Sequence, residues 1–275
     1  MKKILLLNIF LIVIFNILLA LYVRDKGDVM LDNIIEDNVY KNVNYYKEDN
    51  LNRYINYKNE NKNLNYDEVV KNVNINLDKN FYEDITDALN KYTNLVLVNK
   101  HYYLNEDYIP KDLVQIDYKY TSGINVLADK EAADAFELMS TDANAIGLNI
   151  KTISAYRNYE YQKKLYDNYL LNDPQEIVDT YSARAGHSEH QTGLAFDVYN
   201  IAQPYTSFGE TNEYKWLKIN AYKYGFIIRY TSDNSYITGY KDEPWHIRYV
   251  GVNNATYIYE NNITLEEYIL NKGSI

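Results

Sequence analysis

The stretch SEHQTGLAFD at residues 188–197 places His190 and Asp197 on either side of Gly193. Glycine lets the backbone bend or approach another segment closely, so the imidazole and the carboxylate can converge on one point. Asp197 follows Ala195 by two residues, and both therefore face the same side of a strand, where the small alanine leaves room. This stretch predicts a strand that carries two potential metal ligands.

A second stretch, EPWH at residues 243–246, adds another histidine with an acidic residue close by. A catalytic zinc ion needs three protein ligands with nitrogen or oxygen donors and leaves a fourth position to water. His190, Asp197 and His246 would supply two imidazoles and one carboxylate. This set suits Zn²⁺ and does not suit copper(I) or an iron–sulfur cluster, so the two stretches together predict a zinc site.

Glu243 precedes His246 by three residues, with Pro244 and Trp245 stiffening the link. That spacing can hold a carboxylate beside a metal-bound water without making it a ligand, and zinc lowers the pKa of such a water toward about 7. Glu243 would then act as the general base and pass the proton to the leaving amine. The alternative makes Glu243 a fourth ligand of a closed structural site, but such sites are usually rich in cysteine.

The sequence around these stretches predicts an α+β fold. Residues 129–147 predict a helix with an N-cap aspartate, Asp129, and a terminating glycine, Gly147. Its apolar face would consist of Phe136, Met139, Ala143 and Ile146. Further helices are predicted at 159–170 and 212–224, a loop at 171–189, and strands at 148–152, 192–199, 226–230 and 245–250. A final short helix would begin at a capping box formed by Thr264 and Glu267. Because the links between the late strands are short, we expect an antiparallel sheet, flanked by helices, that bears the zinc site.

The first 23 residues predict a membrane anchor. Two lysines precede an apolar run at 4–23, which only two asparagines interrupt. About 20 helical residues span roughly 30 Å of hydrocarbon. The lysines would stay inside the cell and direct the rest of the chain outward. No cleavage site of small residues accompanies Ala20, so an uncleaved signal-anchor is favoured over a removed signal peptide, which would leave a secreted protein.

The remainder divides into two parts. Residues 24–94, rich in Asn, Asp, Lys and Tyr, read as a polar and partly helical stalk with a connecting segment. Residues 95–275 read as the catalytic domain. This organisation predicts a single-pass protein of the cell membrane whose catalytic domain is extracytoplasmic.

Composition excludes several classes of function. The chain of 275 residues has a formal net charge of −10, which argues against a nucleic-acid surface because phosphate binding needs clustered lysine and arginine. It contains no cysteine, which excludes disulfides, thiolate metal sites and a cysteine nucleophile. The negative net charge also offers no attraction toward anionic polymers, so any affinity for them must come from a shaped site.

The pattern Ser-x-His-x-x-Gly-x-Ala-x-Asp followed by Glu-x-x-His resembles that of the VanY-type D-alanyl-D-alanine carboxypeptidases and their L,D-carboxypeptidase relatives. Further matching stretches are SAYR at 154–157, YQ at 161–162, WL at 216–217, NA at 220–221, YGF at 224–226, TGY at 238–240 and RYVG at 248–251. The resemblance covers about residues 95–270. It implies a domain similar to that of the Hedgehog-type metallopeptidases, with zinc on His190, Asp197 and His246.

The same resemblance implies roles for side chains that are not metal ligands. Glu243 would be the general base, and Arg157 would polarise the scissile carbonyl or hold the terminal carboxylate of the substrate. Ser188 and Gln162 would bind the substrate peptide. The two remaining histidines have no expected role: His187 is predicted in a loop and His101 on the surface.

The resemblance implies hydrolytic removal of the C-terminal D-alanine from peptidoglycan stem peptides outside the cell membrane. An L,D-carboxypeptidase acting on the tetrapeptide stem would use the same catalytic residues, and endopeptidase cleavage is a less favoured reading because of the Arg157 match. A non-catalytic wall-binding module on a zinc-stabilised fold is a further alternative. Such a module would be expected to lack the base or a ligand, whereas this sequence has Glu243 and all three ligands.

Overall fold

The computed structural model describes Tyr22 and residues 39–273. The expected anchor at 1–23 and the first part of the stalk therefore lie outside the described residues, apart from Tyr22. Within the part of the chain that is described, no helix is both long and apolar enough to cross a membrane. The chain divides into two compact units, Met1–Asn74 and Ile75–Ile275.

The described part of the first unit is a small helical fold. Its elements are η1 (Glu48–Asn50), α2 (Leu51–Glu60) and α3 (Tyr66–Asn74). They enclose a core of Tyr40, Tyr54, Val69, Val70 and Val73. The Tyr54 hydroxyl donates a hydrogen bond to Asn74 Oδ1 at 2.8 Å, which ties α2 to the end of α3. The segment interpreted as a stalk thus contains a packed pair of helices.

The second unit is built around a four-stranded antiparallel sheet with the order β5-β6-β8-β7. Its strands are β5 (Lys151–Ser154), β6 (Ala195–Tyr199), β7 (Phe226–Ile228) and β8 (His246–Tyr249). Two short pairs lie outside this sheet: β1 (Thr86–Asp87) runs parallel to β2 (Tyr102–Tyr103), and β3 (Leu113–Gln115) runs antiparallel to β4 (Leu127–Asp129). The mixed composition of helices and an antiparallel sheet agrees with the predicted α+β class.

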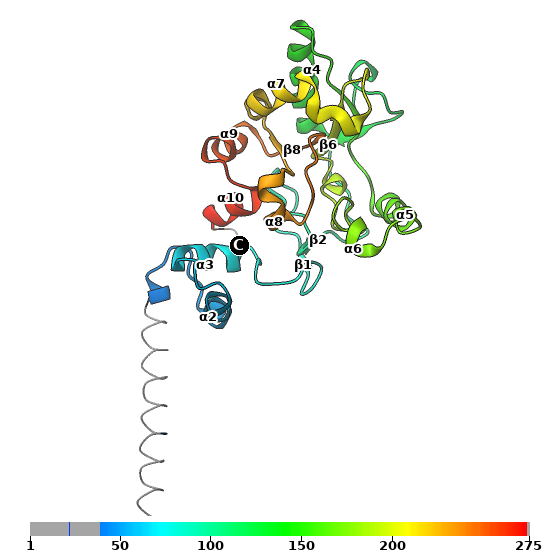
Figure 1. Ribbon diagram of the computed structural model, residues 1–275. Helices are drawn as coiled ribbons and strands as arrows, with labels where there is room; N and C mark the ends of the chain where they lie inside the picture. Colours follow the sequence, from blue (N-terminus) through cyan, green and yellow to red (C-terminus); the bar gives the residue numbers. More distant parts are fainter. Residues whose placement is uncertain (1–21, 23–38, 274–275) are drawn as a thin grey trace, which may run out of the picture. The chain divides into compact units, whose positions relative to one another are not determined.

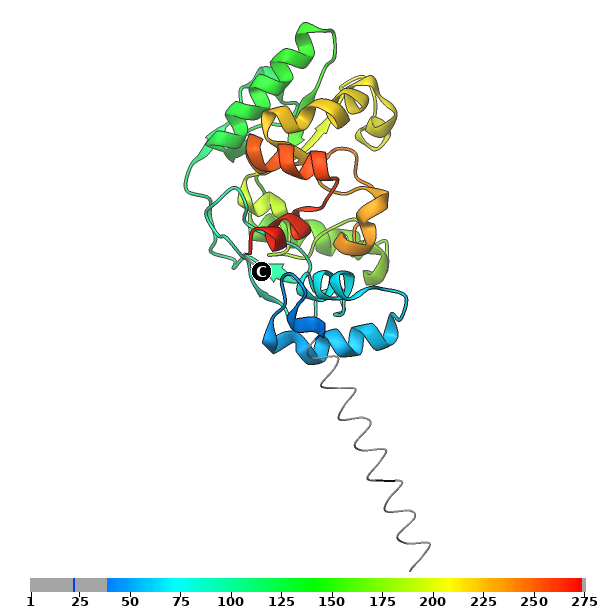
Figure 2. The ribbon, with the colours of Figure 1, turned by 90° about the vertical axis from the view of Figure 1, so that its left-hand side faces the viewer.

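Helices surround the strands of this unit. They are α4 (Lys130–Ala145), α5 (Tyr159–Tyr169), α6 (Gln175–Val178), α7 (Asn212–Asn220), α8 (Ser235–Thr238), α9 (Val252–Asn261) and α10 (Leu265–Asn271). The 3-10 helices are η2 (Tyr118–Tyr120), η3 (Glu189–Thr192), η4 (Tyr205–Glu210), η5 (Ala221–Tyr224) and η6 (Ser232–Asn234). In the view of Figure 1, α9 and α10 lie on one side of β6 and β8, and α5 and α6 lie on the other. The helices α4, α7 and α9 follow one another along one side of the unit (Figures 1 and 2).

The core of the second unit joins α4 to the sheet. Phe136 and Met139 of α4 are fully buried in one cluster with Phe196 of β6 and Phe226 of β7. The rings of Phe136 and Phe196 stack with centroids 5.0 Å apart. Because a buried aromatic side chain stabilises a fold by about 1.5–3 kcal/mol, this layer fixes β6, and with it Asp197, against the helix.

The predicted ends of α4 are confirmed. The Asp129 side chain accepts hydrogen bonds from the backbone N–H groups of Glu131 and Ala132, and Gly147 adopts a φ of +82° directly after the C-cap. The prediction that Ile146 belongs to the apolar face is wrong, because this side chain is 62% exposed. Ile146 is the C-cap residue and has already left the helical geometry that sets the face.

The other predicted strands and helices are mostly found with shorter bounds, but the strand predicted at 148–152 is displaced to Lys151–Ser154. The segment 171–189 is not loop throughout, because Pro174 caps the short helix α6. The segment 212–224 is α7 followed by the 3-10 turn η5, and the capping box of Thr264 and Glu267 opens α10 as predicted. The compact unit begins at Ile75, whereas the sequence places the start of the catalytic domain at Leu95. The assignment of stalk and catalytic roles to these parts stays a prediction.

Candidate metal and catalytic site

The sheet register brings two of the predicted ligands directly opposite each other. Asp197 of β6 and His246 of β8 are paired residues of neighbouring antiparallel strands. Such residues have Cβ atoms roughly 4.5–5.5 Å apart on the same face of a sheet. Asp197 also lies opposite Ser154 of β5, next to a register shift after Thr152. The aspartate is therefore held at the centre of the sheet between two strands.

His190 reaches the same face from the turn that precedes β6. It lies in η3, which Ser188 caps at its start and which ends at Gly193 with a φ of +72°. A Cβ atom at Gly193 would lie 2.9 Å from the backbone nitrogen of Asp129, so glycine is required for both conformation and space. The predicted role of Gly193 in bringing His190 toward Asp197 has this structural basis.

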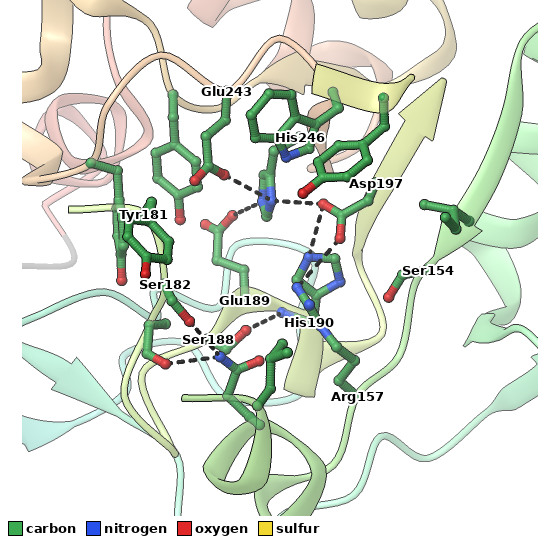
Figure 3. Close-up of a pocket in the computed structure, with 18 of the residues that line it drawn as sticks. Ser154, Arg157, Tyr181, Ser182, Ser188, Glu189, His190, Asp197, Glu243 and His246 are labelled. Carbon is green, nitrogen blue, oxygen red and sulfur yellow. Dashed lines mark hydrogen bonds and ion pairs between the residues drawn. The ribbon is translucent and has the colours of Figure 1, made fainter. Parts of the chain in front are cut away.

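Three potential ligand atoms converge at this point. His190 Nε2 lies 3.3 Å and His246 Nδ1 lies 3.4 Å from Asp197 Oδ1. One ligand atom from each of the three residues falls within 4.8 Å of the other two. Figure 3 shows the three side chains pointing toward one another. Their separations are larger than covalent contact and small enough for a single ion to touch all three.

The donor chemistry also fits a metal ion. His190 Nδ1 donates to the backbone carbonyl of Ala155 at 2.6 Å, which leaves its Nε2 without a proton. This buried Nε2 makes no hydrogen bond among the described residues. A buried nitrogen lone pair without a donor is costly unless something else occupies it. An imidazole, a second imidazole and a carboxylate form a donor set that zinc favours.

Burial and neighbouring charges set the protonation of the three groups. Burial lowers the pKa of His190 to about 4, which keeps it neutral. Burial would also lower the pKa of His246, but the carboxylates of Asp197 and Glu189, one beside each ring nitrogen, raise it to about 9. Burial would raise the pKa of Asp197, but its interactions with His190, Arg157 and His246 hold it well below its usual range. A metal ion must therefore displace a proton from His246, as ligand binding by imidazole requires.

Glu243 lies at the edge of this cluster and is nearly buried. Its Oε2 lies 3.9 Å from His246 Nδ1, and the backbone carbonyl of Glu243 accepts a hydrogen bond from His246 N–H at 3.0 Å. Burial raises the pKa of Glu243 to about 7. A carboxylate that gains and loses a proton near neutral pH has the property that general acid–base catalysis needs.

Arg157 lies on the other side of the aspartate. Its Nη2 lies 3.4 Å from Asp197 Oδ2, and its backbone N–H donates to the carbonyl of His190 at 3.1 Å. Its Nε is buried without a hydrogen-bond partner among the described residues. The guanidinium therefore keeps donor capacity for an anionic or carbonyl group in the cavity.

These side chains line a cavity of about 510 Å³. The lining includes Arg157, Gln162, Ser188, His190, Asp197, Glu243 and His246, together with Tyr161, Tyr169, Tyr181, Tyr205, Tyr230 and Tyr240. Gln162 donates from Nε2 to the carbonyl of Ala183 at 2.8 Å, and its buried Oε1 has no partner among the described residues. Ser188 Oγ accepts from the His190 N–H at 3.4 Å, which leaves its hydroxyl proton to donate. Every side chain that the sequence assigned to the site thus faces one cavity.

Three buried charged residues next to the predicted metal ligands, Glu189, Arg229 and Arg248, were not assigned from the sequence. Glu189 Oε2 lies 3.2 Å from His246 Nε2, and its Oε1 accepts hydrogen bonds from Arg229 and Arg248. Burial would raise the pKa of Glu189, but the two arginine charges hold it well below its usual range. The acidic residue next to His190 in the first stretch was the available signal, although its contact is with the other histidine.

The two remaining histidines are both buried. His187 lies in a loop, as predicted, and its Nδ1 is 2.7 Å from the backbone carbonyl of Asn99. The prediction that His101 is a surface residue is wrong, because it is only 3% exposed and packs against Phe81. Burial lowers the pKa of His101 to about 4, so it is a neutral core residue.

Comparison with known proteins shows the family to which the chain is similar. The sequence model of the VanY family, described as D-alanyl-D-alanine carboxypeptidase, matches residues 125–252. The Bacillus subtilis protein YodJ is 40% identical over 210 residues, which cover 72% of this chain and 77% of YodJ.

Solved structures agree with the sequence comparison. The LdcB LD-carboxypeptidase matches with a TM-score of 0.59 and 42% identity, over 63% of this chain and 84% of LdcB. The structure of LdcB reveals the molecular basis of its peptidoglycan recognition. A mutant of the D,D-pentapeptidase VanY from a VanB-type resistance cassette, in complex with Zn(II), matches with a TM-score of 0.55 and 32% identity. That match covers 64% of this chain and 98% of the VanY chain.

Proposed function

This chain belongs to the VanY family of D-alanyl-D-alanine carboxypeptidases, and on that premise we propose that it removes the C-terminal D-alanine from peptidoglycan stem peptides with the help of zinc. The observation that carries the proposal is the convergence of His190, Asp197 and His246 in one cavity, with Glu243 beside them. A related VanY enzyme of known structure binds Zn(II), which supports zinc as the metal.

His190 Nε2, Asp197 and His246 Nδ1 would hold the ion. When bound, Zn²⁺ acts as a Lewis acid that polarises a carbonyl group and lowers the pKa of water. The residues of the chain prepare for this by keeping His190 neutral and Asp197 ionised. The carbonyl of Ala155 and the carboxylate of Glu189 hold the two imidazole rings from behind.

Glu243 would move the proton in the reaction. Its carboxylate takes a proton from the attacking water and delivers it to the amino group of the departing D-alanine. The burial that raises its pKa to about 7 makes both steps accessible near neutral pH. No arginine or lysine forms an ion pair with Glu243 among the described residues, so no such partner competes for its lone pairs.

Arg157, Gln162 and Ser188 would bind the peptide. A guanidinium matches the geometry of a terminal carboxylate and also stabilises a carbonyl oxygen that gains negative charge. The unpartnered Oε1 of Gln162 can accept from a peptide N–H, and the Ser188 hydroxyl can donate to a peptide carbonyl. A contact between Arg157 and the terminal carboxylate would place the C-terminal residue of the substrate in the site, so it favours exopeptidase over endopeptidase action.

L,D-carboxypeptidase action on the tetrapeptide stem is a second candidate. It is favoured by the 42% identity to the LdcB LD-carboxypeptidase, against 32% to the VanY D,D-pentapeptidase. Both substrates have a terminal carboxylate and a scissile amide, and both activities would use the same metal ligands. They differ in the length and stereochemistry of the peptide that the tyrosine-lined cavity accepts.

We further propose that residues 1–23 anchor the protein in the cell membrane, with the catalytic unit outside. This proposal rests on the apolar run at 4–23 and the lysines before it. Stem peptides lie on that side of the membrane. Recovery of the full-length protein in the aqueous fraction of lysed cells, instead of the membrane fraction, would contradict the proposal.

The enzymatic proposal is tested by incubating the purified full-length protein with a pentapeptide and a tetrapeptide stem and measuring released D-alanine. We expect release from at least one of them, its loss with a chelator and its return with Zn²⁺. Release from the pentapeptide alone supports D,D-specificity, and release from the tetrapeptide alone supports L,D-specificity. Activity that survives complete metal removal would exclude the mechanism.

A further inference from the structure

Four charged side chains form a buried cluster directly behind the candidate site. These residues, here called the buried charge cluster, are Glu189, Arg229, Arg248 and Glu266, and none of them is more than 2% exposed. Two glutamates balance two arginines. Burying four charges is expensive and does not by itself stabilise a fold compared with apolar residues. A cluster of this kind next to a catalytic site therefore suggests a role beyond packing.

Among the described residues, Glu189 is the member of the cluster whose side chain hydrogen-bonds to the side chain of a predicted metal ligand. Glu189 places Oε2 3.2 Å from His246 Nε2 (Figure 3). Its Oε1 accepts from Arg229 Nε at 2.8 Å and from Arg248 Nη1 at 3.0 Å. Glu266 lies one step further from the site. Its Oε1 accepts from Arg229 Nη2 at 2.6 Å and from Asn99 Nδ2 at 2.9 Å.

The two arginines hold Glu189 in one orientation. Arg248 is fixed in turn by hydrogen bonds from Nη2 to the backbone carbonyls of Asn94 and Val96, at 3.0 and 2.9 Å. Arg229 is fixed by Glu266 of α10. A guanidinium can only donate hydrogen bonds, so the Glu189 oxygen that faces the arginines must accept. Two guanidinium charges within 3.0 Å of Oε1 favour the ionised carboxylate, so the other oxygen faces His246 as an acceptor.

This arrangement decides which nitrogen of His246 carries the proton. An ionised carboxylate can only accept, so His246 Nε2 must donate to Glu189, with which it forms a hydrogen bond of 3.2 Å. Nδ1 faces Asp197 at a longer distance and without a hydrogen bond, so the neutral imidazole keeps its proton on Nε2 and its lone pair on Nδ1. Nδ1 is the nitrogen that lies 3.4 Å from Asp197 Oδ1. We infer that Glu189 is a positioning residue that fixes the tautomer and ring orientation of His246 so that Nδ1 is presented to zinc. This inference rests on the proposed zinc site.

The two histidines of the site are positioned by different means. His190 is held by a backbone carbonyl, that of Ala155, and presents Nε2. His246 is held by a side chain and presents Nδ1. A backbone carbonyl cannot be removed by substitution, whereas Glu189 can. Outer carboxylates that orient ligand histidines typically change metal affinity by roughly 10- to 100-fold when they are substituted.

Glutamine at position 189 is a sharp probe because it nearly preserves shape. Its carbonyl oxygen would have to face the arginine donors, which leaves its NH₂ group facing His246 Nε2. That NH₂ group needs an acceptor, so the proton of the imidazole would move to Nδ1. A protonated Nδ1 cannot bind a metal ion. Glu189→Gln should therefore invert the tautomer instead of merely weakening a contact.

A single substitution leaves an arginine charge uncompensated and can prevent folding, so a charge-balanced pair is used. The test variant combines Glu189→Gln with Arg248→Met. Its matched control combines Glu266→Gln with Arg248→Met. Each variant keeps one arginine and one glutamate of the buried charge cluster, and Arg229 contacts both glutamates. Only the test variant changes the group that faces His246.

Two measurements are made on wild type, test variant and control. Zinc affinity is measured by competition with a chromophoric chelator, and the ring tautomers are read from imidazole ¹⁵N shifts of the metal-free proteins in alkaline solution, where the rings are neutral. We expect zinc affinity to fall by roughly 10- to 100-fold in the test variant compared with the control. We expect His246 to be protonated on Nε2 in wild type and control and on Nδ1 in the test variant.

The outcomes separate the inference from the proposed function. Equal zinc affinities in the test variant and control, or an Nε2–H tautomer in both, would overturn the role of Glu189. Failure of the wild-type protein to bind zinc would overturn the proposed function, while the tautomer measurement would still decide whether Glu189 orients His246.

Discussion

Two glutamates flank the imidazole ring of His246 and differ in the nitrogen that they approach and in the direction of their pKa shifts. Glu243 approaches His246 Nδ1 from the cavity at 3.9 Å, and Glu189 approaches Nε2 from the interior at 3.2 Å. Burial raises the pKa of Glu243 to about 7, whereas two arginines hold the pKa of Glu189 well below its usual range. The residue type is the same, so the surrounding charges decide which carboxylate exchanges protons and which one stays ionised.

The largest difference should appear in catalysis. Glu243→Gln removes the proposed general base and should lower kcat/KM for D-alanine release by about 10²- to 10⁴-fold, with zinc affinity largely retained. Glu260→Gln, at an exposed position of α9, is the control and should leave activity unchanged. A Glu243→Gln protein with wild-type turnover would remove Glu243 from the mechanism.

The second difference concerns stability and depends on the arginines. Glu189→Gln leaves Arg229 and Arg248 with one carboxylate between them, and breaking a buried ion pair in this way costs about 3–5 kcal/mol of unfolding free energy. Because the folded-state pKa of Glu189 is depressed, its contribution to stability is present above the unfolded pKa of about 4.5 and is lost progressively as the pH falls from that value toward the folded-state pKa. In urea unfolding of the metal-free proteins, wild type should exceed Glu189→Gln in unfolding free energy at neutral pH, and this difference should become smaller toward pH 3.

Glu243 should show the opposite pH dependence. Its folded-state pKa of about 7 lies above its ordinary value of 4.5, so the metal-free protein loses stability as the pH rises from 4.5 through about 7. At about 1.4 kcal/mol per pH unit, the loss is about 3 kcal/mol, complete above pH 7 and absent below the unfolded pKa. Metal-free Glu243→Gln should therefore unfold at higher urea concentration than wild type at pH 8, with little difference at pH 5. An equal difference in unfolding free energy between wild type and Glu243→Gln at pH 8 and at pH 5 would contradict the assigned pKa.

The smallest effect extends the comparison to the arginines. Arg157 lines the cavity and has an unpartnered Nε, whereas each side-chain nitrogen of Arg248 donates to a protein group. Arg157→Lys loses a two-pronged contact to the terminal carboxylate and should raise KM by roughly 10-fold, with unchanged melting temperature. Amidation of the substrate carboxylate should produce a similar KM for wild type and variant if that contact exists. A wild-type KM for Arg157→Lys would exclude this role.

The sequence predicted the site better than it predicted what lies behind it. His190, Asp197, His246 and Glu243 occur in two short patterns whose residue types already indicate metal chemistry, and the structure brings them into one cavity. Their meeting depends on the pairing of Asp197 with His246 across two strands. That register follows from tertiary packing, which the sequence patterns do not contain.

The wrong prediction for His101 and the unassigned buried arginines have the same physical cause. Arg229, Arg248 and His101 are polar residues that would ordinarily be exposed, and only long-range contacts reveal that they are buried. Glu189 is adjacent to His190 in the sequence, but adjacent residues of a turn point in different directions, and its carboxylate reaches His246. Residue spacing identifies chemical groups, whereas their partners depend on the fold.

The most direct test of the account is anomalous diffraction at the zinc absorption edge from crystals of the zinc-loaded protein. We predict a single zinc peak coordinated by His190 Nε2, Asp197 and His246 Nδ1, with Glu243 outside the coordination shell and Glu189 bonded to His246 Nε2. A zinc ion bound by Glu243 as a fourth ligand, or located away from these three residues, would contradict the account.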